Sequence, residues 1–181
     1  MASGGYGRIV FTASGAMYGH PTVGAYAAAK LGLIGLAKVL HQEALMTGLD
    51  LKVNVVAPIA ATRMARDAQK ARFGDLMDPE NVSAVVAYLV SDQCGISGEV
   101  LHGGGSHVAR IFVGQTLGWA SGRTGLTPEE VRDHLDEAFA LEGFAIPANG
   151  NEATDLIHQR ATGRHEDLGD EIIPAALRER V

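Results

Sequence analysis

The chain has 181 residues, of which 46% are hydrophobic and 20% charged, and its net charge at pH 7 is -6. This composition excludes extended disorder, and the acidic balance argues against nucleic acid or an anionic membrane as the main partner. A single cysteine, Cys94, excludes an internal disulfide framework and suits the reducing cytoplasm, where we expect the protein to reside. No apolar run approaches the length of a membrane span.

The first half of the chain predicts two strands with a long helix between them. Residues 8–13 are apolar and β-rich, which is typical of a buried strand, and a loop containing glycine and proline starts at Ser14. Residues 23–47 contain no proline and are rich in alanine and leucine, so they predict a helix that is apolar nearly all round. Such a helix is expected to pack on a sheet and on a second subunit. Residues 51–56 predict the second strand, which Pro58 ends.

The middle of the chain continues the alternation of helix and strand. Residues 62–73 predict a short amphipathic helix. Asp78 followed by Pro79 is typical of a helix start, with aspartate as the N-cap and proline at the first helical position. Residues 98–102 predict a third, short strand, and residues 103–105 are interpreted as a turn.

The last part of the sequence is more polar. Thr127 begins a capping-box pattern that predicts a helix to about Leu141, and a loosely packed tail with a short helix near 174–180 is expected beyond it. We therefore predict two parts: a partial α/β domain over residues 1–125, and a C-terminal helix and tail over residues 126–181.

Three side chains suggest a site for a carbonyl/alcohol pair. Tyr26 and Lys30 are four residues apart, so they share one face of the predicted helix. A neighbouring ammonium favours the phenolate, and such a tyrosine can pass a proton to or from an alcohol oxygen. Ser14, at the end of the neighbouring strand, can hold the same oxygen. The hydride that completes the reaction must come from a cofactor, since no side chain carries one.

The same residues carry a family resemblance. Residues 7–14, the YxxxK-containing segment 25–37 and the segment 53–58 (Val-Asn-Val-Val-Ala-Pro) resemble the short-chain dehydrogenase/reductase family. The similarity runs from residue 5 to about residue 120. A closer resemblance, carried by residues 58–64 and 101–118, is to the (3R)-hydroxyacyl-CoA dehydrogenase domains of multifunctional β-oxidation enzymes.

The resemblance implies roles for individual residues. Ser14, Tyr26 and Lys30 would be the catalytic residues, and Tyr26 and Lys30 would also contact the cofactor, with Lys30 binding the nicotinamide ribose. Four residues after the second strand would line the nicotinamide: Pro58, Ile59, Ala60 and Thr62. Residues 63–77 would form the substrate lid. NAD or NADP is the implied cofactor, and the residue that distinguishes them is not among those matched.

Two features depart from the family pattern. Ser14 and Tyr26 are twelve residues apart, one fewer than the family usually shows. The glycines near the start (Gly4, Gly5 and Gly7) precede the first predicted strand, whereas the family's phosphate-binding glycines lie between a strand and a helix. The predicted fold is therefore α/β: the C-terminal half of a Rossmann-like doubly wound parallel sheet of about three strands, with the N-terminal dinucleotide-binding half absent.

Two functions remain open on this sequence. The first is an NAD(P)-dependent oxidoreductase acting on a secondary alcohol or ketone, with a 3-hydroxyacyl-CoA or another hydroxy-lipid as the expected substrate. The second is a non-catalytic subunit or truncated paralogue that acts as an interaction partner. A homo- or hetero-oligomer is expected in either case. No metal site is expected, because no cysteine or carboxylate pattern accompanies His102 and His107.

Overall fold

The computed structural model describes residues 1–62, 71 and 74–163. By contacts, the chain divides into two compact units, Met1–Ile111 and Phe112–Val181. Each unit is described by itself below. The predicted organisation, with a partial domain running to residue 125, stays a prediction.

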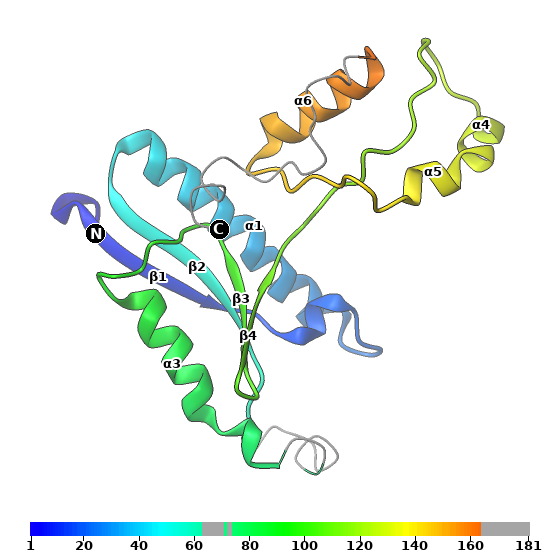
Figure 1. The fold of residues 1–181 in the computed structure, drawn as a ribbon. Coiled ribbons are helices and arrows are strands. Elements are labelled where there is room, and N and C mark those ends of the chain that lie inside the picture. The colour runs from blue at the N-terminus through cyan, green and yellow to red at the C-terminus, as the bar shows by residue number, and fades with distance from the viewer. Residues whose placement is uncertain (63–70, 72–73, 164–181) are drawn as a thin grey trace. The chain divides into compact units, whose positions relative to one another are not determined.

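The first unit contains one sheet with the strand order β1-β2-β3-β4 (Figure 1). Its strands are β1 (Tyr6–Thr12), β2 (Asp50–Pro58), β3 (Val100–Gly104) and β4 (His107–Ile111). The first three run parallel, and β4 pairs antiparallel to β3. The three predicted strands are thus confirmed, and the sheet gains a fourth.

Strand β4 was not predicted, because its turn is unusual. Gly105 and Ser106 connect β3 to β4, and both have positive φ, 62° and 55°. Two residues with positive φ form the tight turn that suits a hairpin, but asparagine or glycine normally occupies both positions. Because serine occupies the second position, the sequence indicates a turn but not the hairpin.

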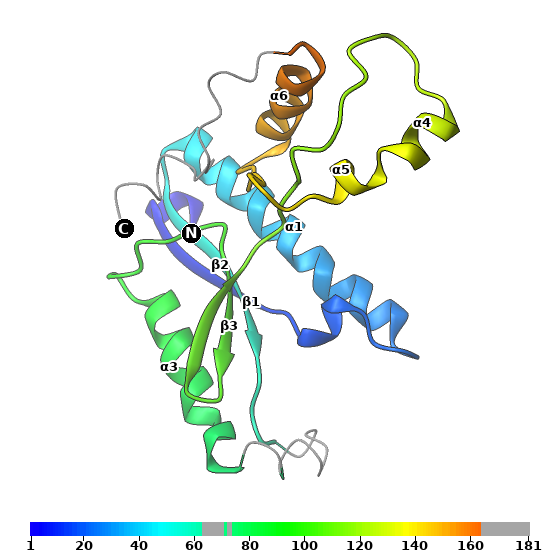
Figure 2. The same ribbon diagram turned by 45° about the vertical axis from the view of Figure 1, so that its right-hand side comes forward.

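Helices cover both faces of this sheet. Helix α1 (Gly24–Thr47) lies on one face and α3 (Pro79–Val90) on the other (Figure 2). Alternate residues of β2 point to opposite faces: Val55 packs with Ile34 of α1, and Val56 packs with Leu89 of α3. The unit is therefore a three-layer α/β fold with a mostly parallel sheet, as predicted.

Local signals explain where these helices begin and end. Helix α1 ends at Gly48, which adopts φ 66°, a conformation that glycine tolerates best. At the start of α3 the Asp78 side chain accepts a hydrogen bond of 2.8 Å from the Glu80 amide, which confirms the predicted N-cap. The short helix η3 (Gly74–Met77) precedes it. The predicted helix over 62–73 and most of the predicted lid lie outside the described residues.

One buried polar side chain joins β2 to the loop before β3. Asn54 is 0% exposed. Its amide donates to the Ile96 carbonyl at 3.0 Å, and its oxygen accepts from the Glu99 amide at 3.1 Å. Cys94 lies beside it, buried. Asn54 is stable in the core because both ends of its side-chain amide are hydrogen-bonded.

His41 of α1 makes the stability of the first unit depend on pH. The half-buried ring lies against Gly98, and burial lowers its pKa below the ordinary 6.5; Glu99 opposes this shift, while Lys52 and Lys38 add to it. Because the unfolded ring binds its proton at higher pH, this contribution to stability is present above pH 6.5 and is lost as the pH falls toward the lower folded-state pKa. We expect denaturant unfolding to show the folded chain losing stability between about pH 7.5 and about pH 5.5.

His41→Gln is the matched variant for this measurement. It should lose less stability than the wild type across the same interval, because glutamine does not titrate. Asp50, whose pKa is lowered mainly by its hydrogen bond with Arg8, titrates in a more acidic window and does not interfere. Equal pH slopes in the two proteins would contradict the assignment to His41.

Within residues 112–163, the described part of the second unit, there are three α-helices: α4 (Pro128–Asp133), α5 (Leu135–Phe139) and α6 (Gly150–Ala161). The predicted capping box is confirmed: Thr127 Oγ1 accepts from the Glu130 amide at 3.3 Å, and Glu130 Oε2 accepts from the Thr127 amide at 2.9 Å. The helix predicted to reach Leu141 is interrupted at His134, whose φ of -113° is not helical, and α5 then ends at Phe139.

Helix α6 corrects the prediction of a loosely packed tail. Asn149 caps it by accepting hydrogen bonds from the amides of Asn151 and Glu152, and Leu156 is buried. The sequence did not predict this helix because its composition is polar and Leu156 is its one buried residue. The helix predicted near 174–180 lies outside the described residues. Among the described helices, none has the length and apolar character needed to cross a bilayer.

Candidate active site

A cavity of about 810 Å³ opens at the carboxyl ends of β1 and β2, in the first unit. All seven residues predicted from the sequence line it. They are Ser14, Tyr26, Lys30, Pro58, Ile59, Ala60 and Thr62. The structure therefore brings together three segments that are far apart in the sequence: the loop after β1, the first turns of α1 and the segment after β2.

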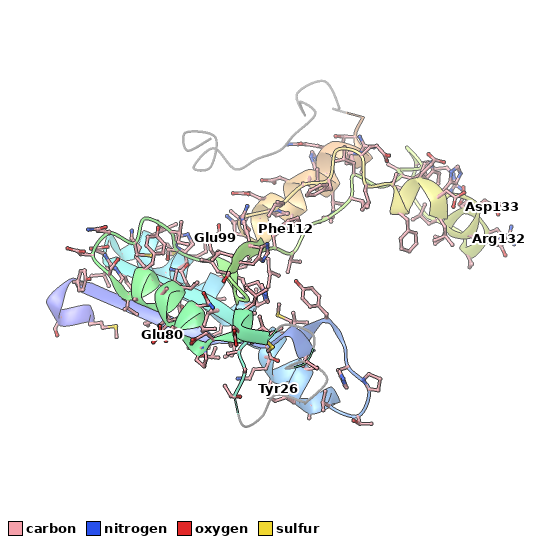
Figure 3. All side chains as sticks on the ribbon, turned by 60° about the horizontal axis from the view of Figure 1, so that its bottom comes forward. Tyr26, Glu80, Glu99, Phe112, Arg132 and Asp133 are labelled. Atoms are coloured by element: carbon pink, nitrogen blue, oxygen red, sulfur yellow. The ribbon has the colours of Figure 1, made fainter. Side chains whose placement is uncertain are left out.

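The tyrosine and the lysine lie on one face of α1, as their spacing predicts. The Lys30 ammonium is 5.5 Å from the centroid of the Tyr26 ring. It also donates a hydrogen bond of 2.7 Å to the Thr12 carbonyl at the end of β1, which fixes its position between helix and strand. Tyr26 is 46% exposed and lies in the amino-terminal half of the helix (Figure 3). Its ring is thus accessible from the cavity while a cation lies beside it.

The serine has a local structural bond as well as its place in the cavity. Ser14 Oγ accepts a hydrogen bond of 3.2 Å from the Ala16 amide and caps the short helix η2 (Gly15–Tyr18). This bond uses a lone pair of the oxygen, so the hydroxyl hydrogen can still donate to a ligand. The twelve-residue spacing to Tyr26 is accommodated by η2 and by Thr22, whose φ is 73°.

The segment after β2 is held on two sides. The Ile59 amide donates to the Gly103 carbonyl of β3 at 3.0 Å, and the Ala61 amide donates to the Met77 carbonyl at 2.6 Å. These bonds fix the backbone of the segment between β3 and η3. Pro58, which lacks an amide hydrogen, ends the strand here as predicted.

The sequence did not indicate the opposite wall of the cavity. Buried Met77 of η3 contributes to it, together with five residues of α3: Pro79, Val82, Ser83, Val86 and Ala87. The Asp78-Pro79 signal locates the start of α3, but nothing local indicates that this start meets the ends of β1 and β2. Except for Ser83 this wall is apolar, so the cavity has a polar side, formed by Ser14, Tyr26 and Lys30, and a hydrophobic side.

The cavity has the size and the position of a small-molecule site. Its volume lies in the range of small-molecule sites, and ligands of open α/β sheets bind at the carboxyl ends of the strands.

Two of the glycines near the start of the chain, Gly5 and Gly7, have structural roles in the first unit. Gly5 turns with φ 68°, and Gly7 lies inside β1, where a Cβ would come within 2.6 Å of Met1 Sδ and 2.9 Å of Leu51 Cδ1.

Comparison with known proteins identifies the family. The short chain dehydrogenase family matches residues 1–73, the part of the chain that contains Ser14, Tyr26, Lys30 and the segment after β2. Residues 1–73 belong to the short-chain dehydrogenase family. This match confirms the resemblance to the short-chain dehydrogenase/reductase family that the sequence shows. The family generally uses NAD or NADP.

Two curated relatives extend the match. The peroxisomal hydratase-dehydrogenase-epimerase of Neurospora crassa is 29% identical over 170 residues, which cover 92% of this chain and 19% of that protein. The 3-oxoacyl-[acyl-carrier-protein] reductase of Salmonella typhimurium is 41% identical over 88 residues, which cover 42% of this chain and 35% of the reductase.

A solved structure agrees with the short-chain dehydrogenase assignment. The peroxisomal multifunctional enzyme type 2 of Drosophila melanogaster superposes with a TM-score of 0.74 and 25% identity, over 91% of this chain and 30% of that one. The chain spans about a third or less of the length of these proteins. The shared fold supports the Rossmann-like description of the sheet.

Proposed function

We propose that the chain provides the catalytic side chains of an NAD(P)-dependent oxidoreductase that interconverts a secondary alcohol and a ketone. The observation that carries the proposal is the shared lining of one cavity by a tyrosine, a lysine and a serine. Tyr26, Lys30 and Ser14 converge there at the carboxyl ends of two parallel strands. This combination offers a proton acceptor, a cation beside it and a hydrogen-bond donor for one substrate oxygen.

Each of the three side chains has a separate role in alcohol oxidation. Ser14 donates a hydrogen bond to the substrate oxygen and orients it. Tyr26, as phenolate, accepts the hydroxyl proton, and in the reverse direction the phenol returns it. Lys30, 5.5 Å from the ring, stabilises the negative charge on the phenolate oxygen and is available to the ribose of the cofactor. When bound, the nicotinamide ring accepts or supplies the hydride at the substrate carbon.

The remaining cofactor contacts are proposed for the segment after β2. The nicotinamide of NAD or NADP would be lined by four residues: Pro58, Ile59, Ala60 and Thr62. In this proposal the chain corresponds to the C-terminal half of the doubly wound sheet, and polypeptide outside these 181 residues binds the adenosine half. Among the described strands none pairs with the outer edge of β1, and Ile9, Val10 and Phe11 are only half-buried in this strand of apolar character, which supports the proposal.

The proposed substrate is a 3-hydroxyacyl thioester, such as a 3-hydroxyacyl-CoA. The Salmonella relative is a reductase of 3-oxoacyl groups by name, and the carbonyl at that position is the oxidised partner of a 3-hydroxyl group. The apolar side of the cavity, which includes Val82, Val86 and Ala87, is suited to the carbon chain of an acyl group.

Assembly and location are also proposals. Leu31, Leu36 and Val39 are exposed on α1, which supports a homo- or hetero-oligomer packed through this helix. The Neurospora and Drosophila relatives are peroxisomal by name, whereas the sequence predicts the cytoplasm. Imaging of a fluorescently tagged chain distinguishes the two compartments.

Calorimetric titration with NADH and NADPH tests the cofactor part of the proposal, on protein whose assembly state has been measured. We expect one of the two to bind, and Lys30→Met to weaken that binding by about tenfold or more, since a hydrogen bond to a charged group contributes ~1.5–3 kcal/mol. Lys38→Met is the matched control, because Lys38 lies on the same helix but does not line the cavity.

Two results would overturn the proposal for this chain. One is a folded wild-type protein that binds neither nucleotide, which would favour the non-catalytic subunit or truncated paralogue. The other is equal weakening by Lys30→Met and Lys38→Met, which would mean that the cavity does not hold the cofactor.

A further inference from the structure

A backbone contact between β3 and the segment after β2 occurs at Gly104. A Cβ atom built on Gly104 would lie 2.0 Å from the Ile59 carbonyl oxygen, 2.8 Å from Ile59 Cγ2 and 3.0 Å from the Ile59 carbonyl carbon. Gly104 also has φ 135°, a conformation that side chains rarely adopt. The two backbones can approach this closely only because residue 104 has no side chain.

We propose that Gly104 is a positioning residue that sets the location of the segment Ile59–Thr62 against the cavity. The inference rests on the proposed function, because Ile59, Ala60 and Thr62 of this segment are its nicotinamide-facing residues. Gly104 does not line the cavity itself. Its action is indirect, through the path that it leaves open for the Ile59 carbonyl.

The contact cannot be relieved by a flexible side chain. The atom nearest to the added Cβ is a backbone oxygen, and two amides of the same segment are hydrogen-bonded. The Ile59 amide is bonded to Gly103, and the Ala61 amide is bonded to Met77, which is 1% exposed. An alanine at position 104 would require the Ile59 carbonyl to move by about 1 Å to reach the closest contact that Cβ atoms show.

A shift of this size matters at a catalytic site. A displacement of 1 Å can cost about 10²-fold in rate when it disturbs the alignment of reacting groups. Here the displaced backbone leads directly into Ala60 and Thr62, which share the cavity with Tyr26 and Lys30. The expected consequence of Gly104→Ala is therefore a poorly formed cofactor surface rather than an altered proton acceptor.

The neighbouring glycine offers a matched control. Gly105 also has positive φ, 62°, but a Cβ built on it meets nothing within 4 Å. Gly105→Ala thus carries the conformational cost of a side chain at positive φ without the contact to Ile59. Because φ 135° is strained for alanine whereas φ 62° lies in the left-handed region, a difference between the two variants reports the contact with Ile59 together with the extra strain at residue 104.

Amide hydrogen exchange of residues 58–62 is the primary measurement, on wild type, Gly104→Ala and Gly105→Ala. In the wild type without cofactor, the Ile59 and Ala61 amides should exchange far more slowly than in an unstructured peptide. Gly104→Ala should speed their exchange by about tenfold or more, since each amide would lose its acceptor geometry, and Gly105→Ala should leave it within about twofold. NADH and NADPH titrations of the same proteins should show at least tenfold weaker binding only in Gly104→Ala.

The two measurements separate the possible failures. If the wild type binds neither nucleotide, the proposed function fails, and the exchange data still decide whether Gly104 positions the segment. If nucleotide binding is normal in the wild type but Gly104→Ala matches Gly105→Ala in both measurements, the positioning role is wrong. If Gly104→Ala does not fold, the wild-type data decide: exchange of the Ile59 and Ala61 amides at the unstructured rate overturns the proposal, and strong protection supports it.

Discussion

Tyr26→Phe is expected to slow alcohol oxidation by the assembled protein by about 10²–10⁴-fold, while the affinity for the nicotinamide cofactor changes by less than about threefold. The substitution removes only the phenolic oxygen, so the ring keeps its place beside the Lys30 ammonium. Without that oxygen the substrate hydroxyl has no proton acceptor in the proposed site. The measurement is steady-state oxidation of a 3-hydroxyacyl-CoA, followed by the absorbance of the reduced nicotinamide.

Tyr18→Phe is the control for this experiment. Tyr18 is 72% exposed and does not line the cavity, so loss of its hydroxyl group should leave the rate within about twofold. A Tyr26→Phe variant as active as the wild type would mean that this tyrosine is not the proton acceptor. Equal losses in both variants would indicate a general effect on folding or assembly.

Leu89→Ala is expected to lower the free energy of unfolding of the first unit by about 2–5 kcal/mol. Leu89 is 0% exposed on the face of α3 that packs on the sheet, where Val56, Val85 and Cys94 belong to the same cluster. Truncation removes buried apolar contacts and leaves a cavity that the rigid strands cannot fill. Urea unfolding followed by circular dichroism measures the change.

Val90→Ala, one residue along the same helix, is the matched control. Val90 is 47% exposed, so its truncation should change the free energy of unfolding by about 0.5 kcal/mol or less. The comparison stays on one helix and contrasts truncation of a buried side chain with truncation of an exposed one. Similar losses at both positions would contradict the packing of α3 against the sheet.

The candidate site combines local and non-local information. Tyr26 and Lys30 are four residues apart on a predicted helix, so their proximity could be predicted from the sequence. The position of Ser14 at the end of a strand could be predicted as well, because an apolar run and a glycine-containing loop are local signals. Met77 and the α3 side of the cavity could not, because their contact with the ends of β1 and β2 depends on how α3 crosses the sheet.

The missed elements have a related cause. Strand β4 depends on a turn in which Ser106 adopts positive φ, and residue type alone seldom indicates that conformation. Helix α6 has a clear cap at Asn149, but its composition is polar and Leu156 is its one buried residue. In both cases the interactions are local, but the residue types are not those that usually indicate the element.

The sequence by itself determined the α/β class, the strand–helix–strand order that carries Ser14, Tyr26 and Lys30, and the resemblance to the short-chain dehydrogenase family, because these depend on periodicity and on short motifs. Only the tertiary structure decided that Gly104 meets the Ile59 carbonyl, that Met77 holds the Ala61 amide and that α3 supplies the hydrophobic wall. The physical reason is that each of these contacts joins segments at least 16 positions apart, which meet only when the sheet and its helices have packed.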